Sequence, residues 1–179
     1  MRPAPLALAL LAATPLVSGC AGPPPAAAAG PVFDPIAFFA GTTRGSGELS
    51  IILRRPRPIT VTGEGRVRAD GTLVLRQRVE GGRGPARTRR WEIRRVGPGR
   101  YAGTLTDATG PVRAEASGAT LRIRYPSAQG QVEQRLTLSP DGRTAANRLT
   151  VKRLGVTVAT VTETIRKYGA SPASAASAP

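Results

Sequence analysis

Histidine is absent from this chain of 179 residues, and cysteine occurs once, at Cys20. The first absence removes imidazole as a general base, as a member of a catalytic triad and as a metal ligand. The single thiol cannot form an internal disulfide. The eleven acidic residues are scattered singly without the spacing of a carboxylate dyad or a metal site, although distant strands can bring two together. We therefore expect no metal, no cofactor and no catalytic centre, and predict that the protein is not an enzyme.

Long hydrophobic runs are also scarce, and the clearest one lies at the start of the chain. Arg2 supplies a positive start, residues 6–13 form a short apolar centre, and Val17-Ser18-Gly19 supply the small residues that precede a cleavage site. The run is shorter than the roughly 20 residues that cross a bilayer, and Pro5 and Pro15 flank it. Residues 1–19 are therefore predicted to be an export signal rather than a transmembrane anchor.

Cys20 follows this signal directly, as in a bacterial lipobox, where the thiol is lipidated and the chain is cut before it. The alternative is an unmodified thiol. Several acyl chains give durable anchoring, because each buried methylene contributes about 0.8 kcal/mol and one chain alone holds only marginally. Ala21 stands where an Asp usually signals inner-membrane retention in Gram-negative lipoproteins. We therefore predict a lipid anchor in the outer membrane, facing the periplasm.

Two segments of low complexity flank the part of the chain that can fold. Residues 20–31 are rich in proline and alanine and are predicted to be a tether. Ten such residues reach about 31 Å when extended at about 3.1 Å each. Residues 169–179 consist mainly of alanine, serine and proline and are predicted to be a disordered tail. Between them, residues 32–168 have the length of one domain.

Apolar residues in this domain recur at every second position, which places them on one face of a β-strand. The clearest examples are Leu49-Ile51-Leu53, Ile59-Val61, Leu73-Leu75, Trp91-Ile93 and Leu121-Ile123-Tyr125. Turn signals such as Asp70-Gly71 and Asp141-Gly142 separate them at the spacing of an antiparallel meander. No convincing helical period occurs after Gly45, which argues against parallel βαβ units.

Eight to ten such strands predict an all-β fold, an antiparallel meander that forms a barrel or a strongly curved half-barrel. Closure removes the exposed strand edges that invite aggregation. Residues 156–165 change face along the strand, which predicts either a bulge or a strand buried on both sides. Six residues on the apolar faces are expected to fill the barrel interior: Trp91, Ile93, Tyr101, Leu121, Ile123 and Tyr125.

One short helix is predicted before the first strand. Asp34 can cap it, Pro35 fits its first turn and Gly41 can end it. All three phenylalanines of the chain lie in this region, so the helix either plugs one end of a barrel or covers the edge of a sheet. Gly41, Gly45 and Gly47 lack the lysine and the following helix of a phosphate-binding loop, and we interpret them as turns.

Positive charge is the strongest remaining signal, with 26 basic residues against 11 acidic ones and a formal net charge of +15. All but two of the cations are arginines, whose guanidinium groups match phosphate in two-point contacts. For an exported, anchored domain the nearest anions are lipid head groups. The alternative is that the arginines only solvate the outer strand faces. Export argues against nucleic acid as a partner. The candidate contacts with anions or a membrane are Arg54, Arg55, Arg57, Arg87, Arg89, Arg90, Arg94 and Arg95.

Motifs spread over the whole domain resemble the bacterial lipoproteins grouped as the domain of unknown function 3833. They are Phe33-Asp34-Pro35-x-Ala37-Phe38-Phe39-x-Gly41, Arg90-Trp91-x-Ile93, Gly99-x-Tyr101-x-Gly103-Thr104, residues 118–125, Asp141-Gly142, Asn147-Arg148, Lys152-x-x-Gly155-Val156 and residues 161–167. The sequence departs from the family near Ser46 and at residues 137–140, where aromatic or acidic residues are usual. The resemblance implies a periplasmic lipoprotein with a calycin-like barrel and implies no activity.

Three functional hypotheses follow. The first is a non-catalytic envelope lipoprotein that binds a lipid or another small amphipathic ligand in its barrel. The second is a structural or assembly factor that uses an arginine-rich face on anionic membrane or on partner proteins, which no motif identifies. The third is a hydrolase of unfamiliar type. Because side chains alone often fill small barrels, a cavity in the interior distinguishes the first hypothesis from the second.

Overall fold

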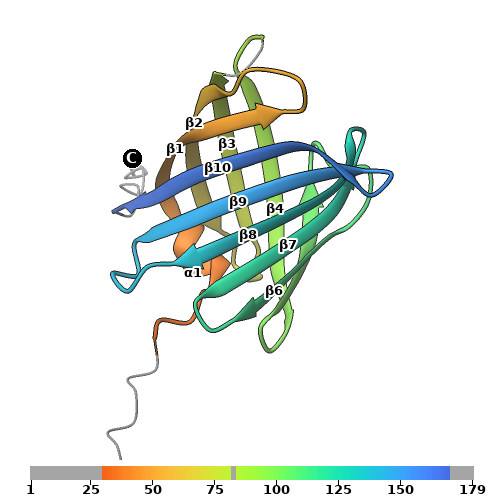
Figure 1. The fold of residues 1–179 in the computed structure, drawn as a ribbon. Coiled ribbons are helices and arrows are strands. Elements are labelled where there is room, and N and C mark those ends of the chain that lie inside the picture. The colour runs from red at the N-terminus through yellow and green to blue at the C-terminus, as the bar shows by residue number, and fades with distance from the viewer. Residues whose placement is uncertain (1–29, 82–83, 170–179) are drawn as a thin grey trace, which may run out of the picture.

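The computed structural model describes residues 30–81 and 84–169, which form a closed barrel of ten antiparallel strands preceded by one short helix (Figure 1). The predicted signal, Cys20 and most of the tether and tail lie outside the described residues. Within the described part of the chain, no helix has the length and apolar character needed to cross a membrane.

The strands run up and down in chain order, and each one pairs with the next. Their bounds are β1 Gly41–Ile51, β2 Arg57–Val67, β3 Leu73–Gly81, β4 Arg87–Gly97, β5 Arg100–Leu105, β6 Val112–Ser117, β7 Thr120–Ser127, β8 Gly130–Leu138, β9 Thr144–Arg153 and β10 Val156–Tyr168. Pairing of β1 with β10, from Thr42↔Tyr168 to Ile51↔Ala159, closes the sheet. The predicted all-β meander is confirmed, and of the two alternatives the closed barrel is the observed one.

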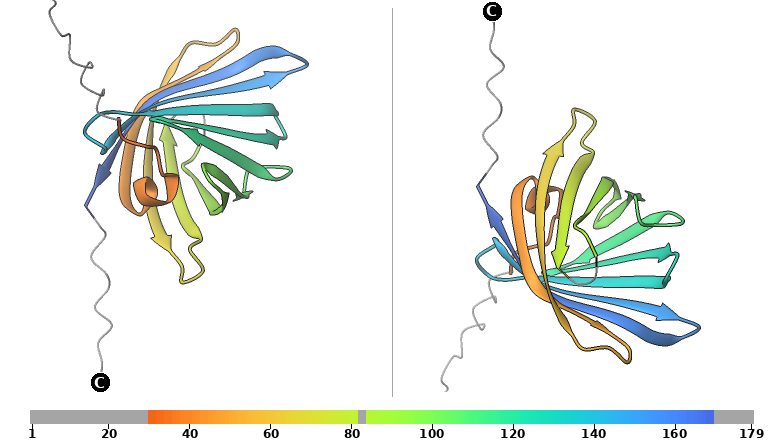
Figure 2. Two further views of the ribbon diagram at one scale, coloured as in Figure 1. Left: turned by 90° about the horizontal axis from the view of Figure 1, so that it is seen from below. Right: turned by 90° about the horizontal axis from the view of Figure 1, so that it is seen from above.

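The helix α1, Pro35–Phe39, forms as the sequence indicates. The Asp34 carboxylate accepts a hydrogen bond from the Ile36 backbone N–H at 3.0 Å, and Pro35 occupies the first turn. Phe33, Phe38 and Phe39 are buried in the central hydrophobic cluster. Because the barrel has no free edge for a helix to cover, α1 acts as a plug, and Figure 2 shows it lying across one end of the barrel.

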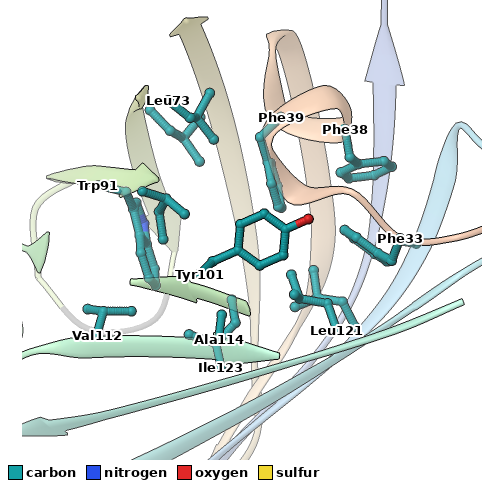
Figure 3. Packing of buried hydrophobic residues seen from close by; sticks show 14 of the residues in the cluster. Phe33, Phe38, Phe39, Leu73, Trp91, Tyr101, Val112, Ala114, Leu121 and Ile123 are labelled. Atoms are coloured by element: carbon teal, nitrogen blue, oxygen red, sulfur yellow. The ribbon is translucent and has the colours of Figure 1, made fainter. Parts of the chain in front are cut away.

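The hydrophobic core runs from this plugged end along β5–β8, where Leu105, Val112, Tyr125 and Val132 belong to the same buried cluster. Tyr101 lies among the phenylalanines of the N-terminal segment, with Trp91 on its other side and Leu121 close by (Figure 3). Phe33 and Leu121 are completely buried. The rings of Phe38 and Phe39 meet edge to face, with centroids 5.0 Å apart.

Two sequence interpretations about β1 are wrong. Gly45 and Gly47 are not turn residues but lie inside the strand, where a side chain at Gly47 would meet the backbone of β10. Leu53 does not continue the strand, because it lies in the β1–β2 turn with φ of 59° and is 99% exposed. Of the two alternatives for β10, the bulge is the observed one, because the register shifts between Thr157 and Ala159.

Candidate ligand-binding site

A cavity of about 330 Å³ occupies the barrel interior between α1 and the opposite end. Pro35 and Phe39 of α1 form its floor, and most of its wall is apolar. The outer part of the wall comes from alternate residues of β1, β2, β3, β9 and β10: Leu49, Ile51, Val61, Val79, Leu149 and Val161. A cavity of this volume and lining belongs to the range that binds small molecules.

The mouth of the cavity lies at the end of the barrel away from α1. The exposed residues of the cavity wall, Gly81, Pro85 and Arg87, belong to the end of β3 and the start of β4. Figure 1 shows the β1–β2 and β3–β4 connections together at this end, with α1 at the other. The β1–β2 turn carries Arg54 and Arg55, and β4 begins with Arg87, so both connections at this end carry basic residues.

Five polar residues interrupt the apolar wall at mid-depth, and we call them the polar belt: Gln77, Arg89, Gln134, Asn147 and Glu163. Asn147 on β9 and Glu163 on β10 are directly opposed in register, and the Asn147 amide Nδ2 donates to Glu163 Oε2 at 2.9 Å. Gln134 on β8 lies diagonally beside Asn147, because Leu136 is the register partner of Asn147. These three side chains are at most 9% exposed.

The other side of the belt is organised by Gln77. Its Oε1 accepts a hydrogen bond from Trp91 Nε1 at 2.8 Å and a longer one from an Arg89 amino group at 3.4 Å. Trp91 also packs edge to face against Tyr125, with ring centroids 5.7 Å apart. The indole is therefore fixed by both packing and a hydrogen bond, and Trp91 forms part of the cavity wall.

Gly45 on β1 makes room for the belt, and Gly63 on β2 makes room for the neighbouring Thr43. A Cβ at Gly45 would lie 1.7 Å from Glu163 Oε1, and one at Gly63 would lie 2.5 Å from Thr43 Oγ1 and 3.7 Å from Gln77 Cγ. A side chain at Gly45 would therefore occupy the space that Glu163 uses, and one at Gly63 would collide with Thr43. This explains why glycines occur within otherwise regular strands.

Burial raises the pKa of Glu163, while the Asn147 hydrogen bond and the positive charge of Arg89 act in the opposite direction. Burial likewise raises the pKa of Tyr125, near which the Arg89 charge also lies. A carboxyl group in an apolar interior is costly when ionised, so its presence requires compensation by hydrogen bonds and a nearby cation. The belt supplies part of this compensation through Asn147 and Arg89.

Four polar atoms of the belt have no hydrogen-bond partner among the described residues: Glu163 Oε1, Asn147 Oδ1, Gln134 Oε1 and Arg89 Nε. Arg89 Nε lies 4.0 Å from Asp107 Oδ2, which is beyond hydrogen-bond distance. Buried polar atoms in proteins nearly always have a partner, which can be water or a ligand. The belt is therefore equipped for further hydrogen bonds inside the cavity.

The structure buries all six residues that the sequence assigned to the interior: Trp91, Ile93, Tyr101, Leu121, Ile123 and Tyr125. They differ in position, however. Trp91, Ile93 and Ile123 line the cavity, whereas Tyr101 belongs to the packed core beside α1. The Tyr101 hydroxyl donates a hydrogen bond to Asp34 Oδ1 at 3.4 Å. Burial is the main reason that the pKa of Tyr101 is raised.

The eight candidate arginines do not form one surface. Arg54, Arg55, Arg57 and Arg87 lie near the mouth and are exposed. Arg95 lies near the plugged end, where it pairs with Asp34 at 2.9 Å and lies over the Tyr101 ring. Arg90 pairs with Glu92 at 2.7 Å on the outer face, and Arg94 is exposed. Arg89 differs most from the expectation, because its side chain points inward and belongs to the polar belt.

Sequence reasoning missed the other members of the belt. A signal was present, because Gln77 has the same phase as Leu73 and Leu75, and Glu163 has the same phase as Val161 and Ile165. A polar residue in the apolar phase of a strand indicates a polar group inside the barrel. Within the described residues, no three side chains of histidine, cysteine, aspartate or glutamate lie together as metal ligands.

A family model described as "Protein of unknown function (DUF3833)" matches residues 14–167. The chain belongs to this family. The match confirms the family resemblance seen in the sequence motifs, and the lipid anchor stays a prediction. No curated protein sequence matches this member of the DUF3833 family.

Two solved structures have a similar fold. The S-type phycobiliprotein lyase from Guillardia theta matches with a TM-score of 0.58 and 5% identity, covering 76% of this chain and 92% of the lyase. A protein of unknown function from the DUF3598 family of Nostoc punctiforme matches with a TM-score of 0.59 and 16% identity, covering 77% of this chain. The match spans half of that second protein. At these identities the likeness concerns the fold.

The expectation that the protein is not an enzyme needs correction. It rested on the absence of histidine and of paired acids, and a barrel of this fold carries the name of a lyase. The composition therefore does not exclude catalysis, because functional groups inside a barrel come from separate strands and leave no local motif. Glu163, Asn147 and Arg89 show such an assembly here, from β10, β9 and β4.

Proposed function

We propose that this protein is a lipid-anchored envelope protein whose barrel binds a small amphipathic molecule. The observation that carries the proposal is the cavity, which combines an apolar wall with a belt of buried polar groups. A solid interior would have favoured a purely structural role, and the interior is not solid. The fold likeness to a protein named as a phycobiliprotein lyase supports the proposal, because a barrel of this fold then has a role beyond a structural one.

Trp91 gives a direct test, because it is the single tryptophan of the chain and forms part of the cavity wall. Ligand entering the cavity should change its fluorescence emission. We expect the protein purified from membranes to retain lipid or another amphipathic compound detectable by mass spectrometry, and that compound to shift Trp91 emission when added back to delipidated protein. Absence of any retained compound, together with unchanged emission for every lipid class tried, would contradict ligand binding.

A pair of variants separates cavity binding from surface binding. Leu149→Phe enlarges a side chain that faces the cavity, whereas Val67→Phe makes a similar change at a residue that is 47% exposed and absent from the cavity wall. We expect Leu149→Phe to weaken binding at least tenfold and Val67→Phe to leave it unchanged. Equal effects of the two changes would place the ligand elsewhere.

The anchor is the second part of the proposal. Cys20 carries the lipid, residues 20–31 connect it to the barrel, and the protein resides in the outer membrane facing the periplasm. Mass spectrometry of the membrane fraction should find a chain that begins at an acylated Cys20. Cys20→Ala should abolish acylation and leave the signal uncut. A native protein with a free Cys20 thiol, or one that still begins at Met1, would contradict this part alone.

A specific observation favours contact with an anionic membrane as a second candidate function. Leu53 in the β1–β2 turn and Leu154 in the β9–β10 turn are 99% and 98% exposed. Arginines stand beside both, as Arg54 and Arg153. The turns are neighbours, because the Ile52 backbone N–H donates to the Val158 carbonyl, and both project to the same side of the barrel (Figure 2). Apolar tips with adjacent cations suit a bilayer of anionic lipid.

Liposome co-sedimentation tests this second candidate. We expect the protein to bind phosphatidylglycerol-containing vesicles more strongly than phosphatidylcholine vesicles, with binding that falls as salt rises. The double change Leu53→Ser with Leu154→Ser should reduce binding, whereas Val96→Ser, at a residue 47% exposed and outside both turns, should not. Binding that ignores lipid charge and salt would remove membrane contact as a function of the arginines.

A further inference from the structure

We propose that the polar belt recognises an uncharged, hydroxylated head group, and that the apolar part of the ligand lies toward the mouth. This inference rests on the proposed binding function and adds the chemical class of the ligand. It starts from the polar atoms that protein folding has left without partners. Their chemistry limits which head groups the cavity accepts.

Three of the four unpartnered atoms are oxygens: the amide oxygens of Asn147 and Gln134 only accept hydrogen bonds, and Glu163 Oε1 accepts when the carboxyl group is ionised. Asn147 already donates through its amide nitrogen to Glu163 Oε2, so its Oδ1 remains for a donor. Glu163 Oε1 and Gln134 Oε1 are likewise without donors. A ligand that fits the belt must therefore supply more than one O–H or N–H group. A carboxylate or phosphate head, which only accepts, leaves these oxygens unpaired.

The fourth atom, Arg89 Nε, is a donor that is ion-paired with Asp107 at 4.0 Å but has no hydrogen-bond acceptor, so it can still donate to one. An alkylammonium head donates three hydrogen bonds but has no lone pair to offer to Arg89. A hydroxyl group both donates and accepts. Two neighbouring hydroxyl groups can therefore satisfy oxygens of Glu163, Asn147 or Gln134 and also accept from Arg89. Of the common lipid head chemistries, a diol matches this mixed set.

Charge leads to the same choice. The belt holds one acid and one base, Glu163 and Arg89, and the positive charge of Arg89 acts on the Glu163 carboxyl. An additional charge on the ligand would be buried beside this pair without a counter-ion of its own, which is costly. An uncharged head adds no such cost. Asp107 adds a second acid at 4.0 Å from Arg89 Nε, and the cavity wall beside the belt is otherwise apolar or amide, with Ile123, Leu149 and Gln77.

The size and orientation of the ligand follow from the cavity. Its volume of about 330 Å³ corresponds to about eleven water-sized groups at roughly 30 Å³ each. The belt lies at mid-depth, and between it and the mouth the wall is formed by apolar residues such as Ile51, Ile59 and Val79. A head at the belt thus places an alkyl tail of about eight carbons against this apolar outer wall.

The experiment compares four eight-carbon compounds with different heads: octane-1,2-diol, octan-1-ol, octylamine and octanoate. Binding to the delipidated protein is measured by Trp91 fluorescence and checked by calorimetry. We expect the diol to bind at least tenfold more tightly than octanoate or octylamine and more tightly than the single alcohol. Equal affinities for all four compounds, or preference for the amine or the acid, would overturn the head-group assignment.

Variants of the belt locate the preference. Asn147→Leu and Gln134→Leu keep side-chain size and remove acceptor oxygens, and neither residue hydrogen-bonds to the Trp91 reporter. Each should reduce the preference for the diol over octan-1-ol while retaining octan-1-ol binding. Leu149→Val, at an apolar wall position, should weaken both compounds by the same factor. An unchanged preference in both belt variants would contradict the proposal.

Folding of each variant is checked by circular dichroism and thermal unfolding. If Asn147→Leu fails to fold because Glu163 loses its amide partner, Gln134→Leu still tests the proposal, because Gln134 Oε1 has no partner to lose. The two proposals fail in different ways. If none of the four compounds binds, small-molecule binding in the cavity is contradicted, whereas binding without head-group preference contradicts only the assignment of the belt.

Discussion

The Asn147 amide donates to the Glu163 carboxylate at 2.9 Å from the directly opposed position on the neighbouring strand. Each partner keeps one oxygen without a hydrogen bond inside the barrel. This pair joins the fold to its proposed function, because it stabilises a buried acid and also presents two acceptors to the cavity. Its energetic cost and its ligand chemistry can both be measured.

The raised pKa of Glu163 predicts a pH-dependent stability. In the unfolded chain the group has an ordinary pKa of about 4.5, whereas burial raises the pKa in the folded protein. The folded state therefore binds the proton more tightly. The associated stability is complete below the unfolded pKa and is lost as pH rises through the folded pKa. Glu163→Gln should remove this loss.

Chemical denaturation of both proteins between about pH 4 and about pH 8 measures the difference. The stability of Glu163→Gln relative to the original protein should increase with pH over the lower part of this range and then stay constant. Glu48→Gln provides a control, because Glu48 lies on β1 outside the cavity wall. Parallel pH profiles for the original protein and Glu163→Gln would contradict a raised pKa.

Two glycines of β1 should respond differently to substitution. At Gly47 an added Cβ would lie 2.0 Å from the Thr162 carbonyl oxygen, so Gly47→Ala must displace β10 backbone and disrupt barrel closure. At Gly45 the clash is with the end of the flexible Glu163 side chain, which can move. We expect thermal unfolding to show a larger loss of stability for Gly47→Ala than for Gly45→Ala.

Gly45→Ala should also change the dependence of stability on pH described above, because it displaces Glu163. Gly47→Ala protein that still folds should keep the original pH dependence. Gly30→Ala is the matched control, because nothing lies within 4 Å of an added Cβ there. The prediction fails if Gly45→Ala proves the more damaging of the two strand changes.

Gln77→Leu removes the acceptor of the Trp91 indole N–H, which is buried and makes its hydrogen bond at 2.8 Å. Leaving a buried donor without a partner costs about 1–3 kcal/mol. The loss in free energy of unfolding should be smaller when Trp91→Phe is already present, because that change removes the donor. A double-mutant cycle by urea denaturation measures this coupling, and additive effects would show that the bond contributes nothing.

Leu53 and Leu154 have φ of 59° and 49°, a left-handed conformation that leucine adopts reluctantly. Both side chains are almost fully exposed, so they contribute little to the core. Leu53→Asn and Leu154→Asn should therefore leave the free energy of unfolding unchanged or increase it by up to about 1 kcal/mol. Urea denaturation checks this. A loss of stability would show that these residues serve the fold rather than an external contact.

Much of the fold could be predicted from residues alone. Alternation in segments such as Leu121-Ile123-Tyr125 indicates strands because side chains on a strand point to opposite faces. The cap at Asp34 and the proline after it indicate α1 for equally local reasons. The bulge in β10 was visible as a change of phase. Each of these signals acts within a few residues of the chain.

The error over Gly45 and Gly47 shows where local reasoning stops. A glycine in a turn and a glycine facing a neighbouring strand look alike in sequence. Their roles differ because β10, more than 110 residues later, passes close to β1 and places Glu163 over Gly45. Arg89 has the same phase as Trp91 and Ile93, so its inward direction was open to prediction, but it was grouped with its neighbouring arginines because clustered cations usually lie on the surface.

The sequence by itself determined an all-β meander with a capped helix in front, because alternation, turns and caps depend on neighbouring residues. Only the tertiary structure decided that β1 closes against β10 and that Gln77, Arg89, Gln134, Asn147 and Glu163 share one cavity. These residues come from five strands, and their meeting depends on register across the whole barrel. The physical reason is that a strand's pattern says which residues face inward, whereas pairing between strands sets which of them meet.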